Sequence, residues 1–220
     1  MSLICSCPSA TALTTIPAVT CPENFGQIQK VAFQRLVKSD GTKNAFTGSV
    51  TSNPAIAVKA SWTALLAATD ATKIVVSPYI NAPTDGGGDA RMSSGGNDDL
   101  GGIPEVLGGN PVTFEGSLRS VPQSVIKAMK ELQCEALAGN LGVFLFDENG
   151  NIEALQDATT STTYYPIPIR ALFIGSKIHG GWDAKDSNLI SWQYPDNYSD
   201  DLAIVKPADF NPLTELVPAS

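Results

Sequence analysis

Two β-prone runs, 141–147 and 152–155, enclose the tetrapeptide Glu148-Asn149-Gly150-Asn151. An Asn-Gly step between such runs is the strongest short-range signal for a β-hairpin, because both residue types tolerate the positive φ of a tight turn. The sequence therefore predicts two antiparallel strands joined by this turn. A chain built around such a pair folds most readily as an antiparallel sheet.

The composition agrees with a β-rich fold. Charged residues make up only 16% of the 220 residues, whereas 19 Gly and 15 Pro supply many turns. The apolar share of 43% is enough to fill a core. We expect a mainly β (α+β) fold, a β-sandwich or barrel-like domain with one packed α-helix, a short second helix and long loops.

Hydrophobic patterning predicts the remaining elements. In 112–119, apolar and polar residues alternate with the period of two of a half-buried strand. Besides this strand and the hairpin, strands are expected at 27–37, 73–80, 164–178, 188–194 and 201–205. Pro78 places the second of these at a sheet edge, because proline cannot donate to a ladder.

Two helices are expected. In 61–70, Ser61 serves as the N-cap and one face carries Trp62, Leu65 and Leu66. A longer helix follows Ser120 and stops at Gly139-Asn140. Its expected buried stripe is Val125, Met129, Leu132 and Ala136, with Cys134 as a small core residue.

Residues 1–24 are rich in Ser, Thr and Pro and lack periodicity, which predicts an extended N-terminal arm ahead of a single domain at 25–220. Cys5, Cys7 and Cys21 lie in this arm, but their spacing fits no zinc motif. No basic region precedes an apolar run there, so we expect no secretory signal. No apolar run approaches the roughly 20 residues of a membrane-spanning helix.

The segment 84–102 is the most unusual, since seven of its 19 residues are Gly and four are Asp. It is expected to be a long mobile loop and the first place to look for binding. Its oxygen ligands would suit calcium, although the spacing matches no EF-hand or nonapeptide repeat. We predict instead a solvated or partner-contacting loop, with a subunit interface at Asp85, Asp89, Arg91, Asp98 and Asp99, and no metal or cofactor.

Catalytic motifs are missing from the sequence. His179 is the single histidine, and no G-x-S-x-G elbow accompanies it. No phosphate-binding loop or distinct carboxylate pair is recognisable either, so no enzymatic activity is expected. The net charge of −8 disfavours static binding of nucleic acid.

An alternative function comes from the aromatic residues near the C-terminus. Side chains that could form a sugar-stacking face are Trp182, Trp192, Tyr194 and Tyr198. Such a face would suit a virion or adhesion module that binds a surface glycan. At strand spacing, however, Trp192 and Tyr194 are more often core or interface residues.

The order of elements resembles that of bacteriophage tail tube proteins, also called major tail proteins. The resemblance is carried by the stretch Glu105–Leu137, the hairpin at 141–155 and the stretch Pro166–Leu202. Together these cover more than half of the chain, whereas the Cys- and Pro-containing arm has no counterpart in that pattern.

This resemblance implies a structural virion protein located in the phage tail and made in the host cytoplasm. It further implies that copies form hexameric rings, which stack into a hollow tube and contact other tail proteins. DNA would pass through the tube without specific binding. Neither catalysis nor a cofactor is implied.

Overall fold

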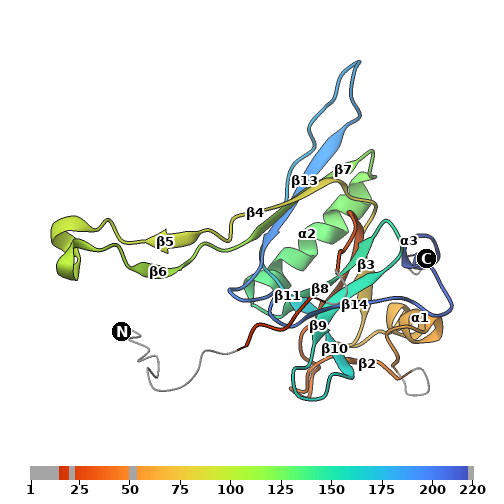
Figure 1. Cartoon of the computed structure of the whole chain (residues 1–220). Coiled ribbons are helices and arrows are strands. Elements are labelled where there is room, and N and C mark those ends of the chain that lie inside the picture. The colour runs from red at the N-terminus through yellow and green to blue at the C-terminus, as the bar shows by residue number, and fades with distance from the viewer. Residues whose placement is uncertain (1–14, 20–22, 50–53, 218–220) are drawn as a thin grey trace.

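Antiparallel strands dominate the computed structural model, which describes residues 15–19, 23–49 and 54–217 (Figure 1). The strands are β1 (Ile28–Arg35), β2 (Phe46–Thr47), β3 (Ile74–Val76), β4 (Asn81–Gly86), β5 (Ala90–Met92), β6 (Val106–Gly109), β7 (Thr113–Arg119), β8 (Leu141–Asp147), β9 (Ile152–Gln156), β10 (Thr163–Tyr165), β11 (Ile167–Pro168), β12 (Arg170–Ile174), β13 (Ser187–Gln193) and β14 (Leu202–Val205). The α-helices are α1 (Lys59–Ala67), α2 (Gln123–Leu137) and α3 (Pro212–Glu215). The predicted mainly β fold is confirmed.

The larger sheet has the order β2-β10-β9-β8-β1-β3, with β11 paired to β8 and β14 paired to β9. The hairpin predicted around Asn149-Gly150 is confirmed, because Phe146 pairs with Ile152 and Gly150 adopts a φ of 79°. Asp147 fixes its turn by accepting hydrogen bonds from the amides of Asn149 and Asn151 at 2.9 and 2.7 Å. As Pro78 indicated, β3 lies at an edge of this sheet.

The smaller sheet has the order β12-β13-β7-β4. The predicted alternation along β7 is confirmed, since Phe114, Gly116 and Leu118 are buried. Phe114 stacks on Trp192 of β13 with ring centroids 3.9 Å apart. These side chains share one core cluster with Val31 and Phe33 of β1, so this core lies between the two sheets.

The long helix α2 covers part of that core with most of the predicted stripe, since Leu132 packs against the core beside Met129 and Ala136. Ile126, Met129 and Ala136 are buried, whereas Val125 is exposed. Cys134 is exposed as well, so its assignment to the core was wrong. Val125 and Ile126 are adjacent apolar residues, and one step rotates the helical face by about 100°. Of the two, Ile126 joins the core cluster that includes Leu172 and Ile174 of β12.

A second core lies on the other face of the larger sheet. Trp62 of α1 contacts Phe46 of β2 and Phe144 of β8 in an aromatic cluster, with ring centroids 4.6 and 5.3 Å away. The prediction that Ser61 is an N-cap was wrong, because α1 begins at Lys59. The Ser61 hydroxyl instead accepts a hydrogen bond from the Ala55 amide at 2.9 Å.

The predicted strand 164–178 is divided into β10, β11 and β12. Pro166 and Pro168 cannot donate to a ladder, and Ala171 adopts a φ of 52°, so one continuous strand is prevented.

Most of the predicted N-terminal arm lies outside the described residues, including Cys5, Cys7 and Cys21. In the described residues, no helix has the length and apolar character needed to span a membrane.

A buried lysine attaches the C-terminal segment to the larger sheet. The Lys30 ammonium, on β1, donates hydrogen bonds to the carbonyls of Leu213 and Leu216 at 2.9 and 3.2 Å. It also lies over the ring of Tyr79, whose hydroxyl donates to the Leu213 carbonyl. Burial lowers the pKa of Lys30, because the ammonium loses contact with water; the two carbonyl acceptors offset part of this desolvation cost.

Replacing Lys30 by Met should lower the free energy of unfolding by about 1–3 kcal/mol, because the buried Leu216 carbonyl loses its donor. Urea denaturation of the two proteins measures the difference. Lys127→Met, at an exposed position of α2, is the matched control and should change stability little. Equal stability of the Lys30 variant and the wild type would contradict this role.

Candidate functional site

Residues 87–111, here called the arm, form a two-stranded projection that leaves the domain between β4 and β7 (Figure 1). Within it, β5 pairs with β6 through Ala90 opposite Gly109 and Met92 opposite Val106. The expectation of a loop without structure at 84–102 is therefore wrong. Apolar periodicity could not reveal these strands, because both faces are exposed and the strands are paired through their backbones without a buried apolar face.

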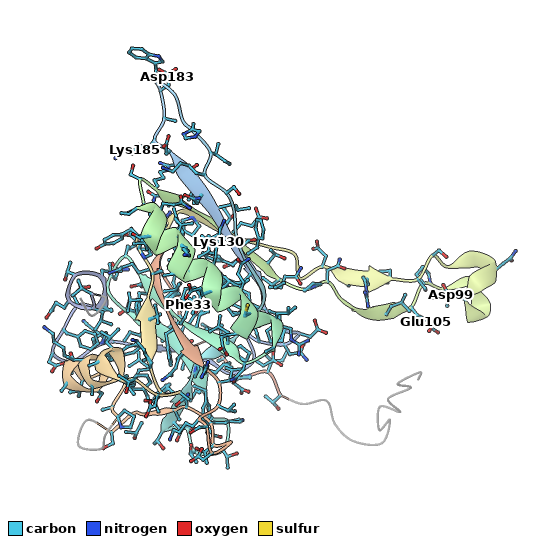
Figure 2. All side chains as sticks on the ribbon, turned by 180° about the vertical axis from the view of Figure 1, so that it is seen from behind. Phe33, Asp99, Glu105, Lys130, Asp183 and Lys185 are labelled. Carbon is cyan, nitrogen blue, oxygen red and sulfur yellow. The ribbon has the colours of Figure 1, made fainter. Side chains whose placement is uncertain are left out.

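The far end of the arm is closed by one carboxylate. Asp99 accepts hydrogen bonds from the Ser93 hydroxyl at 2.5 Å and from the Gly95 amide at 2.7 Å. The Ser93 hydroxyl in turn accepts from the amide of Glu105 at 2.7 Å. Figure 2 shows Asp99 and Glu105 near this end, remote from the core residue Phe33. Asp99 thus has a structural role in the turn.

The five residues predicted to form an interface are spread along this feature. Asp85 lies on β4 at the base, Asp89 and Arg91 lie further out, and Asp98 and Asp99 are in or beside the short 3-10 helix at 96–98. In the part of the chain that the structure describes, no three His, Cys, Asp or Glu side chains gather as a metal site. The predicted interface itself remains a prediction.

Large apolar side chains are exposed along the arm. Met92 lies on β5, Val106 and Leu107 lie on β6, and Ile103 precedes them; each exposes half or more of its surface. Val106 and Leu107 are consecutive on β6, so both faces of the arm carry exposed apolar side chains; exposed apolar surface of this kind is typical of a protein contact site. Sequence reasoning missed these residues, although the run Ile103-Pro104-Glu105-Val106-Leu107 between glycines was the available signal.

The base of the arm requires glycine at one position. Gly87 adopts a φ of 99°, and a Cβ there would lie 2.4 Å from the carbonyl oxygen of Pro111 on the returning strand. At the neighbouring Gly86, a Cβ would meet nothing within 4 Å. Close approach of the two strands and a left-handed backbone therefore coincide at Gly87.

Gly87→Ala should loosen the arm, because the added methyl group and the strained φ cost about 1–3 kcal/mol. Hydrogen exchange of the Ser93 and Asn110 amides, which donate to Glu105 and Asp89 carbonyls across the arm, should accelerate by about tenfold or more. Gly86→Ala is the control and should exchange like the wild type. Identical exchange in both variants would contradict the requirement for glycine at position 87.

The carboxyl group of Glu153, which interacts with Asp85 at the base of the arm, has a raised pKa. Burial, with the charges of Asp85 and Asp147, raises the pKa of Glu153 on β9 to about 7. The unfolded chain ionises this group near 4.5. Folding therefore becomes less favourable as the pH rises from about 4.5 to 7, since the unfolded state loses its proton first.

Glu153→Gln should raise the free energy of unfolding at pH 8 by on the order of 1–3 kcal/mol, because the amide carries no charge to bury. The gain should disappear below about pH 4.5, where the wild-type carboxyl is protonated in both states. Urea denaturation at a series of pH values measures it, with Glu131→Gln on exposed α2 as control. A gain independent of pH would refute the electrostatic cause.

A second projection, residues 175–186, is called here the Trp182 hairpin (Figure 1). Asp186 holds it by accepting from the Gly180 amide at 3.3 Å and by lying 3.4 Å from both Lys177 Nζ and His179 Nδ1. The Gly180 hydrogen bond lowers the pKa of Asp186, and the neighbouring Lys177 and His179 side chains lower it further. His179 is therefore an exposed residue of a hairpin and lacks the enclosure of a catalytic base.

The aromatic residues proposed for glycan stacking are not on one surface. Trp192 and Tyr194 are buried, and Tyr198 stacks on Tyr194 with ring centroids 4.2 Å apart. They belong to the core between the sheets, which overturns the idea of a shared sugar-binding platform. Trp182 alone of these four is fully exposed.

No protein-family model and no curated protein sequence matches the chain. Among solved structures, the chain is similar to one described as the tail of an empty GTA particle, determined with helical refinement in C6 symmetry. The match has 12% sequence identity and a TM-score of 0.30, and it covers 59% of this chain and 82% of the other. Similarity this weak transfers no property of that phage-like tail component to this chain.

Proposed function

We propose that this protein is a structural subunit of a phage-type tail, in which copies assemble into stacked hexameric rings around a channel. The observation that carries the proposal is the arm, an extended hairpin whose apolar side chains are not covered by its own domain. An exposed apolar projection is unfavourable in water unless another surface covers it. The order of elements resembles that of tail tube proteins, and for this reason we propose a tail tube as the assembly.

The arm also suits the symmetry of rings and stacks. A projection from one side of a domain contacts a different surface on the next copy, which makes the contact heterologous. Heterologous contacts close into rings or continue as open filaments, whereas twofold dimers need a surface that complements itself. In this proposal, the N-terminal segment 1–24, which lies mostly outside the described residues, takes part in contacts with neighbouring copies or other tail proteins.

Charge supports passage of DNA through such a channel. The chain has 14 Lys and Arg against 22 Asp and Glu, a formal net charge of −8. An acidic wall repels the phosphate backbone and gives DNA no strong resting site. In this proposal the protein is a non-enzymatic virion component, and its contact with DNA is transient.

Removing the apolar surface of the arm tests the proposal. A variant with Met92, Ile103, Val106 and Leu107 all changed to Ser keeps the backbone pairing but should not form rings or tubes. Light scattering and negative-stain microscopy over a concentration series measure assembly, and wild-type protein should show rings or tubes as concentration rises.

Leu137→Ser provides the matched control, because Leu137 is a similarly exposed apolar residue at the end of α2. It should assemble like the wild type. Unchanged assembly of the four-serine variant would contradict the role of the arm, and a wild-type chain that stays monomeric throughout would contradict the proposed function.

A further inference from the structure

Trp182 is the most exposed large apolar side chain of the described residues, with a relative exposure of 103%. The other two tryptophans are in the cores, where Trp62 and Trp192 are 0% and 1% exposed. Tryptophan is highly buried on average and is one of the residue types enriched among the side chains that anchor interfaces. The exposed position of Trp182 at the turn of a projecting hairpin therefore favours contact with a partner.

The hairpin holds this indole outward through a specific backbone. A Cβ on Gly180 would lie 2.2 Å from the Ala184 carbonyl oxygen, and Gly181 adopts a φ of 69°. Ile178 and Ser187 exchange backbone hydrogen bonds at 2.8 and 2.9 Å across the base. The turn before Trp182 is therefore tight and paired, so little backbone conformational entropy remains to be lost when the indole is bound.

A hollow of about 400 Å³ lies where the arm joins the domain. Its lining includes Thr84, Asp85, Gly87, Pro111, Thr113 and Glu115. This volume is within the range of roughly 300–1,000 Å³ found for pockets that hold small organic groups. Gly86 also lines the hollow, and because Gly86 and Gly87 carry no side chains, this part of the wall is formed by backbone and by Pro111.

The chemistry of the hollow complements the hairpin. An indole N–H is a donor only, and the polar side chains of the hollow offer two carboxylates and two hydroxyls as acceptors. The Asp85 side chain is exposed and therefore accessible to a donor from another chain, and the partial burial of its carboxyl raises its pKa. Lys185, near the turn, has no ion pair among the described residues and is available to Asp85 or Glu115.

The hairpin and the hollow lie at opposite ends of the same sheet. The hairpin leads into β13 at Ser187, which pairs with Arg119, whereas the hollow lies where Gly86 pairs with Thr113. The two ends are six residues apart along β7, which corresponds to roughly 20 Å in an extended strand. Figure 2 likewise shows Asp183 and Lys185 on a projection distinct from the arm that carries Asp99 and Glu105. One chain cannot bring its own Trp182 into its own hollow.

We infer that the Trp182 side chain of one copy inserts into the hollow beside Asp85 of the next copy, in a head-to-tail contact. This inference rests on the proposed function, since it supplies one specific contact of that assembly. A contact between opposite ends of a subunit continues from copy to copy, as rings and stacks require. The arm and the hairpin then contribute two separate contacts.

Tryptophan fluorescence tests the contact directly, because Trp62 and Trp192 are already shielded by the cores. Acrylamide should quench Trp182 strongly in the dilute monomer and weakly in the assembled protein. Trp182→Ala should raise the dissociation constant measured by sedimentation velocity by at least about tenfold. Trp192→Phe, which keeps Trp182, serves as the spectroscopic control.

A mixing experiment separates this contact from a general loss of folding. Trp182→Ala retains the hollow, and Asp85→Lys retains the hairpin but places a cation in the hollow. At concentrations where each variant alone is monomeric, an equimolar mixture should form heterodimers, because one intact hairpin meets one intact hollow. Circular dichroism and thermal unfolding confirm that both variants are folded.

Assembly in which Trp182 stays fully quenchable, or in which Trp182→Ala assembles like the wild type, would overturn this inference and leave the proposed function intact. The same holds if the mixture of variants stays monomeric while the wild type assembles. A wild-type chain that never associates would overturn both.

Discussion

Strand β8 is buried on both faces, and the rest of the structure is arranged around it. Val143 and Leu145 point into the core between the two sheets, whereas Phe144 and Phe146 point into the core beneath α1. Two-sided burial needs apolar residues at consecutive positions, which the sequence Leu141-Gly142-Val143-Phe144-Leu145-Phe146 supplies. Because β1 and β9 pair with its two sides, this strand fixes the register of the larger sheet.

Both projections depend on that framework. The smaller sheet rests on the core beside β8, and the arm and the Trp182 hairpin extend from its opposite ends. Each projection has few apolar contacts with the domain and is held by backbone pairing, with glycines at the points where strands or turns come too close for a Cβ. A rigid sheet with a projection at each end is a suitable unit for repeated head-to-tail contacts.

Much of the fold followed from sequence patterns, and the exceptions have identifiable causes. The hairpin at Asn149-Gly150, the alternation in β7 and the edge position of β3 were predicted correctly because each depends on local chemistry. Cys134 and Val125 were misplaced because the adjacent apolar residues Val125 and Ile126 left the helical face undetermined. The arm was taken for a loop because strands exposed on both faces leave no hydrophobic period.

The sequence drew attention to the segment 84–102 and to Trp182, and a functional role for either stays a prediction. The grouping of Trp182 with Trp192 and Tyr194 on one surface was wrong, because the latter two are buried. The sequence by itself determined the β-rich class, the turns and the acidic charge, since these depend on residue type and short spacing. Only the tertiary structure decided which aromatics are buried and placed the Trp182 hairpin and the hollow at opposite ends of one sheet. Those arrangements depend on strand pairing between residues far apart in the chain, which local patterns do not encode.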